Sequence, residues 1–119
     1  MPAPKTYQGG CHCGRVRFET EADLATVLAC NCSICAQRGL LLVFTGADKF
    51  KLLKGEDELA EYRFHKRVIR HLFCKHCGVE SFVRGKKPDG NETVALNVRC
   101  LDGVDVAALK LTPYDGKSM

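Results

Sequence analysis

Cysteine is the residue that most constrains this chain of 119 residues, because its eight copies are grouped at short spacings. Seven of them fall into two close pairs and one triple: Cys11 and Cys13, Cys74 and Cys77, and Cys30, Cys32 and Cys35. In a cytosolic protein, thiols at such spacings are typical metal ligands, whereas in a secreted protein they indicate disulfides. The pattern therefore predicts a domain built around bound metal.

The two pairs have the local sequence of zinc turns. Cys74 and Cys77 are separated by two residues and followed by Gly78, which can adopt the positive φ that closes such a turn. Gly14 follows the first pair in the same way. Four thiolates complete a tetrahedral zinc site. We therefore expect the two pairs to share one structural zinc, which would clamp two ends of a sheet across about 60 residues of chain.

The triple Cys30, Cys32 and Cys35 leaves one zinc position without a nearby thiol. A zinc with three protein ligands keeps a position for water or substrate, which is the arrangement of catalytic sites. We predict a second, catalytic and more labile zinc here, and hence two zinc ions per chain. In the alternative, Cys100 closes the triple into a four-cysteine structural site.

Two histidines, His12 and His76, lie inside the thiol turns. They are alternative ligands, but the cysteines already complete the site, so we expect both imidazoles to be exposed. The basic cluster of Lys66, Arg67 and Arg70 is interpreted as a solvated surface.

Length and composition indicate one soluble domain over residues 1–119. The chain is 45% hydrophobic and 27% charged, as ordinary globular proteins are. No apolar run is long enough for a membrane span, and the N-terminus lacks the pattern of a signal peptide, so we expect no membrane partner and a cytoplasmic location.

Hydrophobic alternation predicts a mainly antiparallel β protein with little helix. The expected strands are residues 6–10, 15–20, 24–29, 40–45, 50–55, 69–73, 79–84 and 93–98. The apolar run 40–45 is predicted to be a central strand buried on both faces. Residues 30–38 are expected to form a loop or a single helical turn ended by Gly39, and a brief helix is an alternative around residues 59–64.

The order of the thiol motifs resembles that of a known family. CxCG, CxCxxC and FCxxCG occur at residues 11–14, 30–35 and 73–78, and Asn97-Val98-Arg99-Cys100-Leu101-Asp102 follows later. This order is similar to that of the glutathione-dependent formaldehyde-activating enzymes, also called the centromere-protein-V-type domain, over nearly the whole chain. The resemblance implies a zinc-bearing β fold of the Mss4-like type. It also implies a structural zinc on the two pairs and a catalytic zinc on the triple.

The same resemblance implies a carbon–sulfur lyase that joins glutathione, its small-molecule partner, to formaldehyde as S-hydroxymethylglutathione. Glutathione carries carboxylates, so cations near the triple would hold it. Arg38, directly after the triple, is the first candidate. The others are Lys54, Arg99 and Lys117.

The alternative function is a zinc-ribbon-like module that binds nucleic acid or protein through purely structural zincs. The net charge of +4 is compatible with it. However, the chain lacks the aromatics interleaved with Lys or Arg that stack single-stranded bases, which favours the enzyme.

Overall fold

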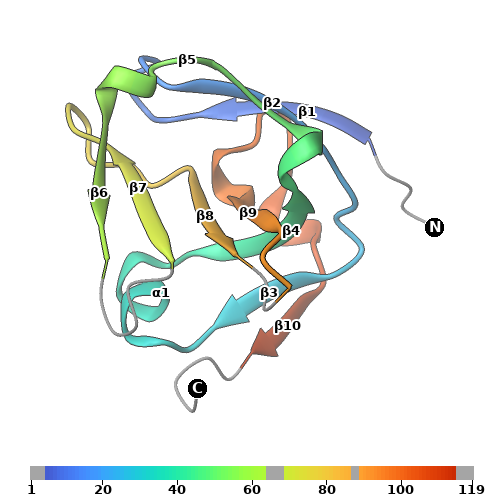
Figure 1. Cartoon of the computed structure of the whole chain (residues 1–119). Coiled ribbons are helices and arrows are strands. Elements are labelled where there is room, and N and C mark those ends of the chain that lie inside the picture. Colours follow the sequence, from blue (N-terminus) through green and yellow to red (C-terminus); the bar gives the residue numbers. More distant parts are fainter. Residues whose placement is uncertain (1–4, 64–68, 87–88, 115–119) are drawn as a thin grey trace.

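Ten strands form two sheets in the computed structural model of the chain, which describes residues 5–63, 69–86 and 89–114 (Figure 1). The smaller sheet is antiparallel, in the order β1-β2-β5, with β1 (Lys5–Gly10), β2 (Arg17–Ala22) and β5 (Phe50–Lys54). The larger sheet contains, in spatial order, β10 (Leu111–Tyr114), β3 (Val27–Cys30), β4 (Leu41–Gly46), β9 (Glu92–Asn97), β8 (Phe82–Lys86), β7 (Arg70–Cys74) and β6 (Leu59–Tyr62). The expected mainly β architecture is confirmed.

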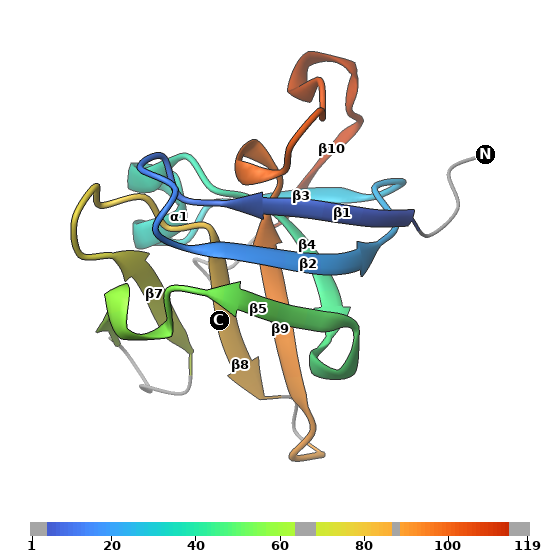
Figure 2. The same cartoon turned by 90° about the horizontal axis from the view of Figure 1, so that it is seen from above.

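The hydrophobic core lies between the two sheets, whose strands cross at a steep angle (Figure 2). Phe18 of β2, Phe50 of β5 and Phe82 of β8 meet there, with ring centroids 4.7, 5.1 and 5.8 Å apart. Such aromatic pairs add about 0.5–1.5 kcal/mol each beyond the burial of their area. Aliphatic side chains of the larger sheet complete the core: Leu41, Val43, Leu72, Val94 and Leu96.

Strand β6 corrects the alternative of a brief helix around residues 59–64. It pairs antiparallel with β7, placing Leu59 opposite Cys74 and Tyr62 opposite His71. The neighbouring strand supplies backbone hydrogen-bond partners that four residues of helix would lack. Phe64 lies outside the described residues.

Strand β4 is central, but it is not buried along its whole length. Leu41, Leu42 and Val43 are buried, whereas Phe44 is 54% exposed. On the outer face of the sheet, Leu42 packs in a small cluster with Cys35 of the helix α1 (Ser33–Arg38). This cover ends before Phe44, which explains why the prediction of two buried faces is wrong at that residue.

Strand β10 departs from the expected antiparallel pattern. It runs parallel to β3, with Tyr114 opposite Cys30. This strand was not predicted, because it contains Pro113, which cannot donate to a β-ladder. An edge strand tolerates a proline, and β10 is at the edge of the larger sheet.

Within residues 5–63, 69–86 and 89–114, helix is confined to short segments. Helix α1 has six residues and ends at Gly39, whose φ of 66° closes it, as expected for this stretch. Four 3-10 turns connect strands: Ala47–Lys49, Glu56–Glu58, Val98–Cys100 and Val106–Ala108. Among the described residues, no helix has the length and apolarity needed to cross a bilayer.

Candidate metal centres

Two groups of cysteine sulfurs lie close enough together to share a metal ion. Within each group the sulfurs are at most 4.8 Å apart; the groups are Cys11, Cys13, Cys74 and Cys77, and Cys30, Cys32 and Cys35. All eight cysteines lie in the described residues, and all are free thiols. The fold therefore brings together the same two groups of cysteines that were predicted from their spacing in the sequence.

The four-cysteine cluster has the dimensions of a closed zinc site. The Sγ of Cys13 lies 3.6 Å from the Sγ of Cys11 and 3.6 Å from the Sγ of Cys74. With zinc–sulfur bonds of about 2.3 Å, tetrahedral ligands lie about 3.8 Å apart. A disulfide would need about 2.05 Å. The donor set and its spacing thus fit zinc.

The two turns that carry these cysteines have the same construction. In the first, Gly14 has a φ of 82° and its N–H donates to the carbonyl of Cys11 at 3.3 Å. In the second, Gly78 has a φ of 81° and its N–H donates to the carbonyl of Cys74 at 2.7 Å. Backbone N–H groups also donate to the sulfurs: that of Val16 lies 3.3 Å from the Sγ of Cys11, and that of His76 lies 3.4 Å from the Sγ of Cys74. Such donors stabilise thiolates.

The cluster joins the two sheets, which corrects the expected clamp across one sheet. Its first pair lies in the turn between β1 and β2 of the smaller sheet. In its second pair, Cys74 ends β7 of the larger sheet and Cys77 lies in the turn toward β8. Cys13 and Cys74, whose sulfurs touch, are 61 residues apart. The error arose because the sequence shows strands but not their assignment to sheets.

Arg15 makes the four-cysteine cluster more acidic. Hydrogen bonds from its backbone N–H and its side chain lower the pKa of Cys13 to about 6. Burial has the opposite effect on Cys74 and raises its pKa to about 11. A guanidinium beside the cluster offsets part of the negative charge that four thiolates bring together.

Neither histidine of the thiol turns belongs to the cluster. His12 is exposed, and the Nε2 of His76 contacts a carboxylate oxygen of Glu58. The four sulfurs form a complete donor set without these imidazoles.

The thiol triple is assembled from two elements. Cys30 ends β3, Cys32 is the N-cap residue of α1, and Cys35 lies in its first turn. Cys35 is only 4% exposed, whereas Cys30 and Cys32 are half-buried. The Cys32 N–H points at the Sγ of Cys30 from 3.5 Å. One side of the triple is therefore covered by protein and the other faces outward.

The surroundings of the triple shift the pKa values of Cys32 and Cys35 in opposite directions. Burial opposes ionisation of Cys32, but hydrogen bonds from the N–H groups of Cys35 and Ile34 and from neighbouring thiols outweigh it, so the pKa of Cys32 is lowered. Burial raises the pKa of Cys35, and the adjacent Cys32 and Cys30 raise it further.

Cys100 lies outside the triple. Its sulfur donates to the backbone carbonyl of Glu80 at 4.0 Å, and burial raises its pKa to about 11, with the charges of Cys11 and Cys77 acting in the same direction. In the described residues, therefore, no fourth sulfur lies close enough to complete the triple. The alternative in which Cys100 closes the site does not occur in this fold.

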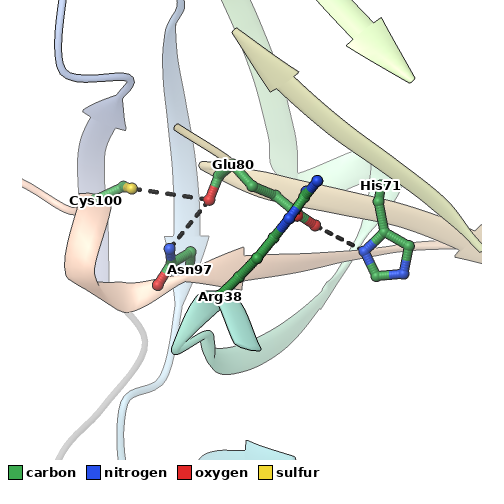
Figure 3. A network of polar contacts seen from close by, with 5 residues as sticks. All are labelled: Arg38, His71, Glu80, Asn97 and Cys100. Carbon is green, nitrogen blue, oxygen red and sulfur yellow. Dashed lines mark hydrogen bonds and ion pairs between the residues drawn. The ribbon is translucent and has the colours of Figure 1, made fainter. Parts of the chain in front are cut away.

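A buried polar network includes Arg38 of α1, the helix that also carries Cys35 (Figure 3). Arg38 of α1 forms an ion pair with Glu80, whose other carboxylate oxygen lies 2.8 Å from the Nδ1 of His71. The Asn97 side chain donates to the backbone carbonyl of Glu80 at 3.0 Å. Glu80 and His71 are both 4% exposed, whereas the Arg38 side chain is 33% exposed. Arg38 therefore reaches from the surface to a buried carboxylate.

A family model described as glutathione-dependent formaldehyde-activating enzyme matches residues 6–114, a span that includes both cysteine groups. The chain belongs to the glutathione-dependent formaldehyde-activating enzyme family. A solved structure of a Rhodobacter sphaeroides protein is 30% identical in sequence and superposes with a TM-score of 0.79. The match covers 89% of this chain and 97% of that one. The two proteins thus share the fold over most of their length.

The cations predicted to bind the carboxylates of glutathione do not all lie in the same part of the fold. Arg38 is on the helix of the triple, and the Arg99 Nε donates to the carbonyl of Gly39 at 3.1 Å, just beyond that helix. Lys54 is on β5 of the smaller sheet, opposite Arg17. Lys117 lies outside the described residues.

The basic cluster is only partly described. Arg70 forms an ion pair with Glu61, which also pairs with Arg63 at 2.7 Å. Lys66 and Arg67 lie outside the described residues. The charge of Arg70 is thus partly offset by a carboxylate that Arg70 shares with Arg63.

Sequence reasoning missed Glu80, the centre of the polar network in this family member. A signal was present. In a strand, residues two apart point to the same face, so Glu80 is expected on the face of Phe82, which is fully buried. A carboxylate at an inward position of a predicted strand indicates a buried partner of opposite charge.

Proposed function

We propose that the chain catalyses the addition of glutathione to formaldehyde and the reverse cleavage, as a zinc-dependent carbon–sulfur lyase. One observation carries the proposal: the thiol triple offers three sulfurs within 4.8 Å and, in the described residues, no fourth. Family membership supports the same chemistry. In the forward direction the thiol sulfur forms a bond to the aldehyde carbon, the C=O π bond breaks, and the thiol proton ends on oxygen.

The residues of the triple suit an exchangeable thiol ligand. Zinc held by Cys30, Cys32 and Cys35 would supply a position at which a fourth thiolate can exchange in, and the three thiolates would leave it a net charge of about −1. Cys30 and Cys32 are half-buried, so a small thiol can approach from solvent. Holding the two reactants together lowers the entropic cost of their reaction. Thiolate chemistry also requires reduced cysteines, so we propose a cytoplasmic location.

Arg38 is our proposed contact for a glutathione carboxylate. Its Nη1 is engaged with Glu80, but a guanidinium carries five N–H donors, and the side chain is 33% exposed. The outward donors are available to a ligand beside α1. Glu80 would then fix the inner side of the guanidinium while the outer side binds substrate.

The decisive test is a titration of cobalt-substituted protein. Glutathione should shift the absorption spectrum of the cobalt at the triple, and at saturating cobalt Arg38→Ala should weaken glutathione binding by about 1.5–3 kcal/mol, the range for a hydrogen bond to a charged group. Binding of 2-mercaptoethanol, which has no carboxylate, should be weakened less than that of glutathione. Lys51→Ala, an exposed cation on β5, is the matched control. A spectrum indifferent to glutathione but sensitive to other small thiols would discard this substrate.

A further inference from the structure

A buried carboxylate connects the thiol-bearing helix to the larger sheet. Glu80 precedes β8 and accepts charged or polar contacts from two elements at once, Arg38 of α1 and His71 of β7 (Figure 3). A carboxylate that is 4% exposed is costly unless it is paired. Its two partners are therefore held at fixed places around it, and α1 is tied to β7.

Helix α1 depends on such contacts because it is weak by itself. It has six residues, and its N-cap residue Cys32 makes no side-chain capping bond. Short helices owe their stability to tertiary packing. Cys35 and Ile34 pack against the outer face of the sheet, and the guanidinium of Arg38 lies 5.2 Å from the ring centroid of Phe73. In the described residues, two charged side chains act at the end of this helix: Arg38 pairs with Glu80, and the Arg99 Nε donates to the carbonyl of Gly39 at 3.1 Å.

The placement of α1 sets the geometry of the triple. Cys30 belongs to β3, whereas Cys35 moves with the helix, and Cys32 lies at the junction. Residues three apart in a helix share one face, so Cys35 and Arg38 are neighbours along α1. A displacement at Arg38 is therefore passed directly to Cys35 and changes its distance from Cys30.

We propose that Glu80 is a positioning residue for the thiol triple and that it acts through Arg38. The inference rests on the proposed function in taking the triple as a metal site. Glu80 holds Arg38, Arg38 holds the end of α1, and α1 holds Cys35 against Cys30. Glu80 itself contributes no sulfur and touches no reactant.

The first test measures metal affinity of the full chain, site by site. Glu80→Gln removes the charge but keeps the shape, and should weaken cobalt binding at the triple about tenfold or more, the usual effect of residues that orient metal ligands. The four-cysteine cluster should keep its affinity, which also shows that the fold persists. Glu61→Gln is the matched control, because Glu61 pairs with two arginines on the surface. It should change neither site.

A double-mutant cycle tests the route through Arg38. If Glu80 acts by holding Arg38, then Glu80→Gln combined with Arg38→Ala should bind cobalt at the triple no more weakly than the worse single variant. Arg38→Lys, which keeps a cation, should retain part of the lost affinity. Fully additive losses would overturn the route.

A second measurement does not need the metal. In metal-free protein, the buried Cys35 should be alkylated several-fold faster in Glu80→Gln than in the parent, because a loosened α1 exposes it, while Glu61→Gln should match the parent. Equal alkylation rates together with equal cobalt affinity at the triple would overturn the proposal. If the parent binds no metal at the triple and Cys35 alkylation is still accelerated, the proposed function fails and the positioning role stands.

Discussion

About one helical turn separates Cys32 and Cys35, two thiols of the triple whose pKa values are shifted in opposite directions. Hydrogen bonds from backbone N–H groups at the start of α1 outweigh burial at Cys32 and lower its pKa, whereas burial raises the pKa of Cys35. Metals bind the thiolate, so Cys35 must lose its proton when the site is filled. In the proposed metal site, the half-buried Cys32 would therefore be the first ligand, and the buried Cys35 would complete the set.

Zinc affinity of the triple should therefore rise with pH. Around neutral pH Cys35 is protonated, and each metal ion bound displaces at least that one proton, so the affinity should increase about tenfold or more per pH unit. Competition with a chelator of known protonation behaviour, between about pH 6.5 and 8.5, measures the slope. A flat profile would contradict the assignment of Cys35 as a thiolate ligand.

Replacing one cysteine in each group should have different consequences. Cys77→Ser opens the cluster that joins the two sheets, and structural zinc contributes about 10–16 kcal/mol in small zinc domains, as much as the whole stability of a typical domain. We expect this variant to be largely unfolded by circular dichroism. Cys32→Ser should lose the metal of the triple and keep the fold.

Cys100→Ser is the control for both variants, since Cys100 is a cysteine outside either group. It should retain two metals and the parental unfolding temperature within a few degrees. A folded, two-metal Cys77→Ser protein would show that the four-cysteine cluster does not hold the sheets together.

At the scale of elements, local sequence was a good guide where a strand carries its own pattern. Residues 15–20 alternate as predicted, with Val16, Phe18 and Thr20 buried. The thiol turns were also predictable, because a glycine with positive φ follows each pair. These features depend on neighbours in the chain, and a sequence displays such neighbours directly.

The elements that the sequence did not reveal are those defined by their partners. Strand β6 is a strand because β7 lies beside it, and β10 is one because β3 does, across more than half the chain. Glu80 and Cys100 are placed by contacts with α1, β9 and the four-cysteine cluster. Such relations are non-local: the period-two pattern indicates that Glu80 points inward, but no period or motif identifies the partners of Glu80 and Cys100.

For the whole molecule, the two cysteine groups occupy mechanically different places. The four-cysteine cluster bridges the sheets, whereas the triple lies on the outer face of the larger sheet, under a short helix. We expect that removal of a metal bound by the first group would require the sheets to separate, whereas removal of a metal bound by the triple would require only a small movement of α1.

Chelation should therefore release metal in two phases. The chain should contain close to two zinc ions by elemental analysis, and a mild chelator should take one quickly and the other only on unfolding, since a three-ligand site is open to exchange. A colorimetric zinc indicator follows both phases, with the Cys32→Ser protein as the control that lacks the fast one. Equal release rates would contradict the division into an open and a closed site.

The parallel pair of β3 and β10 has a consequence for biosynthesis. The N–H of Asn31, between the first two thiols of the triple, donates to the carbonyl of Tyr114 at 3.0 Å, and β10 covers the free edge of β3. Ribosomes deliver residues 27–35 long before residues 111–114. During translation, the nascent chain therefore presents an uncovered strand edge next to three reduced thiols, a combination open to aggregation and oxidation until the last strand arrives.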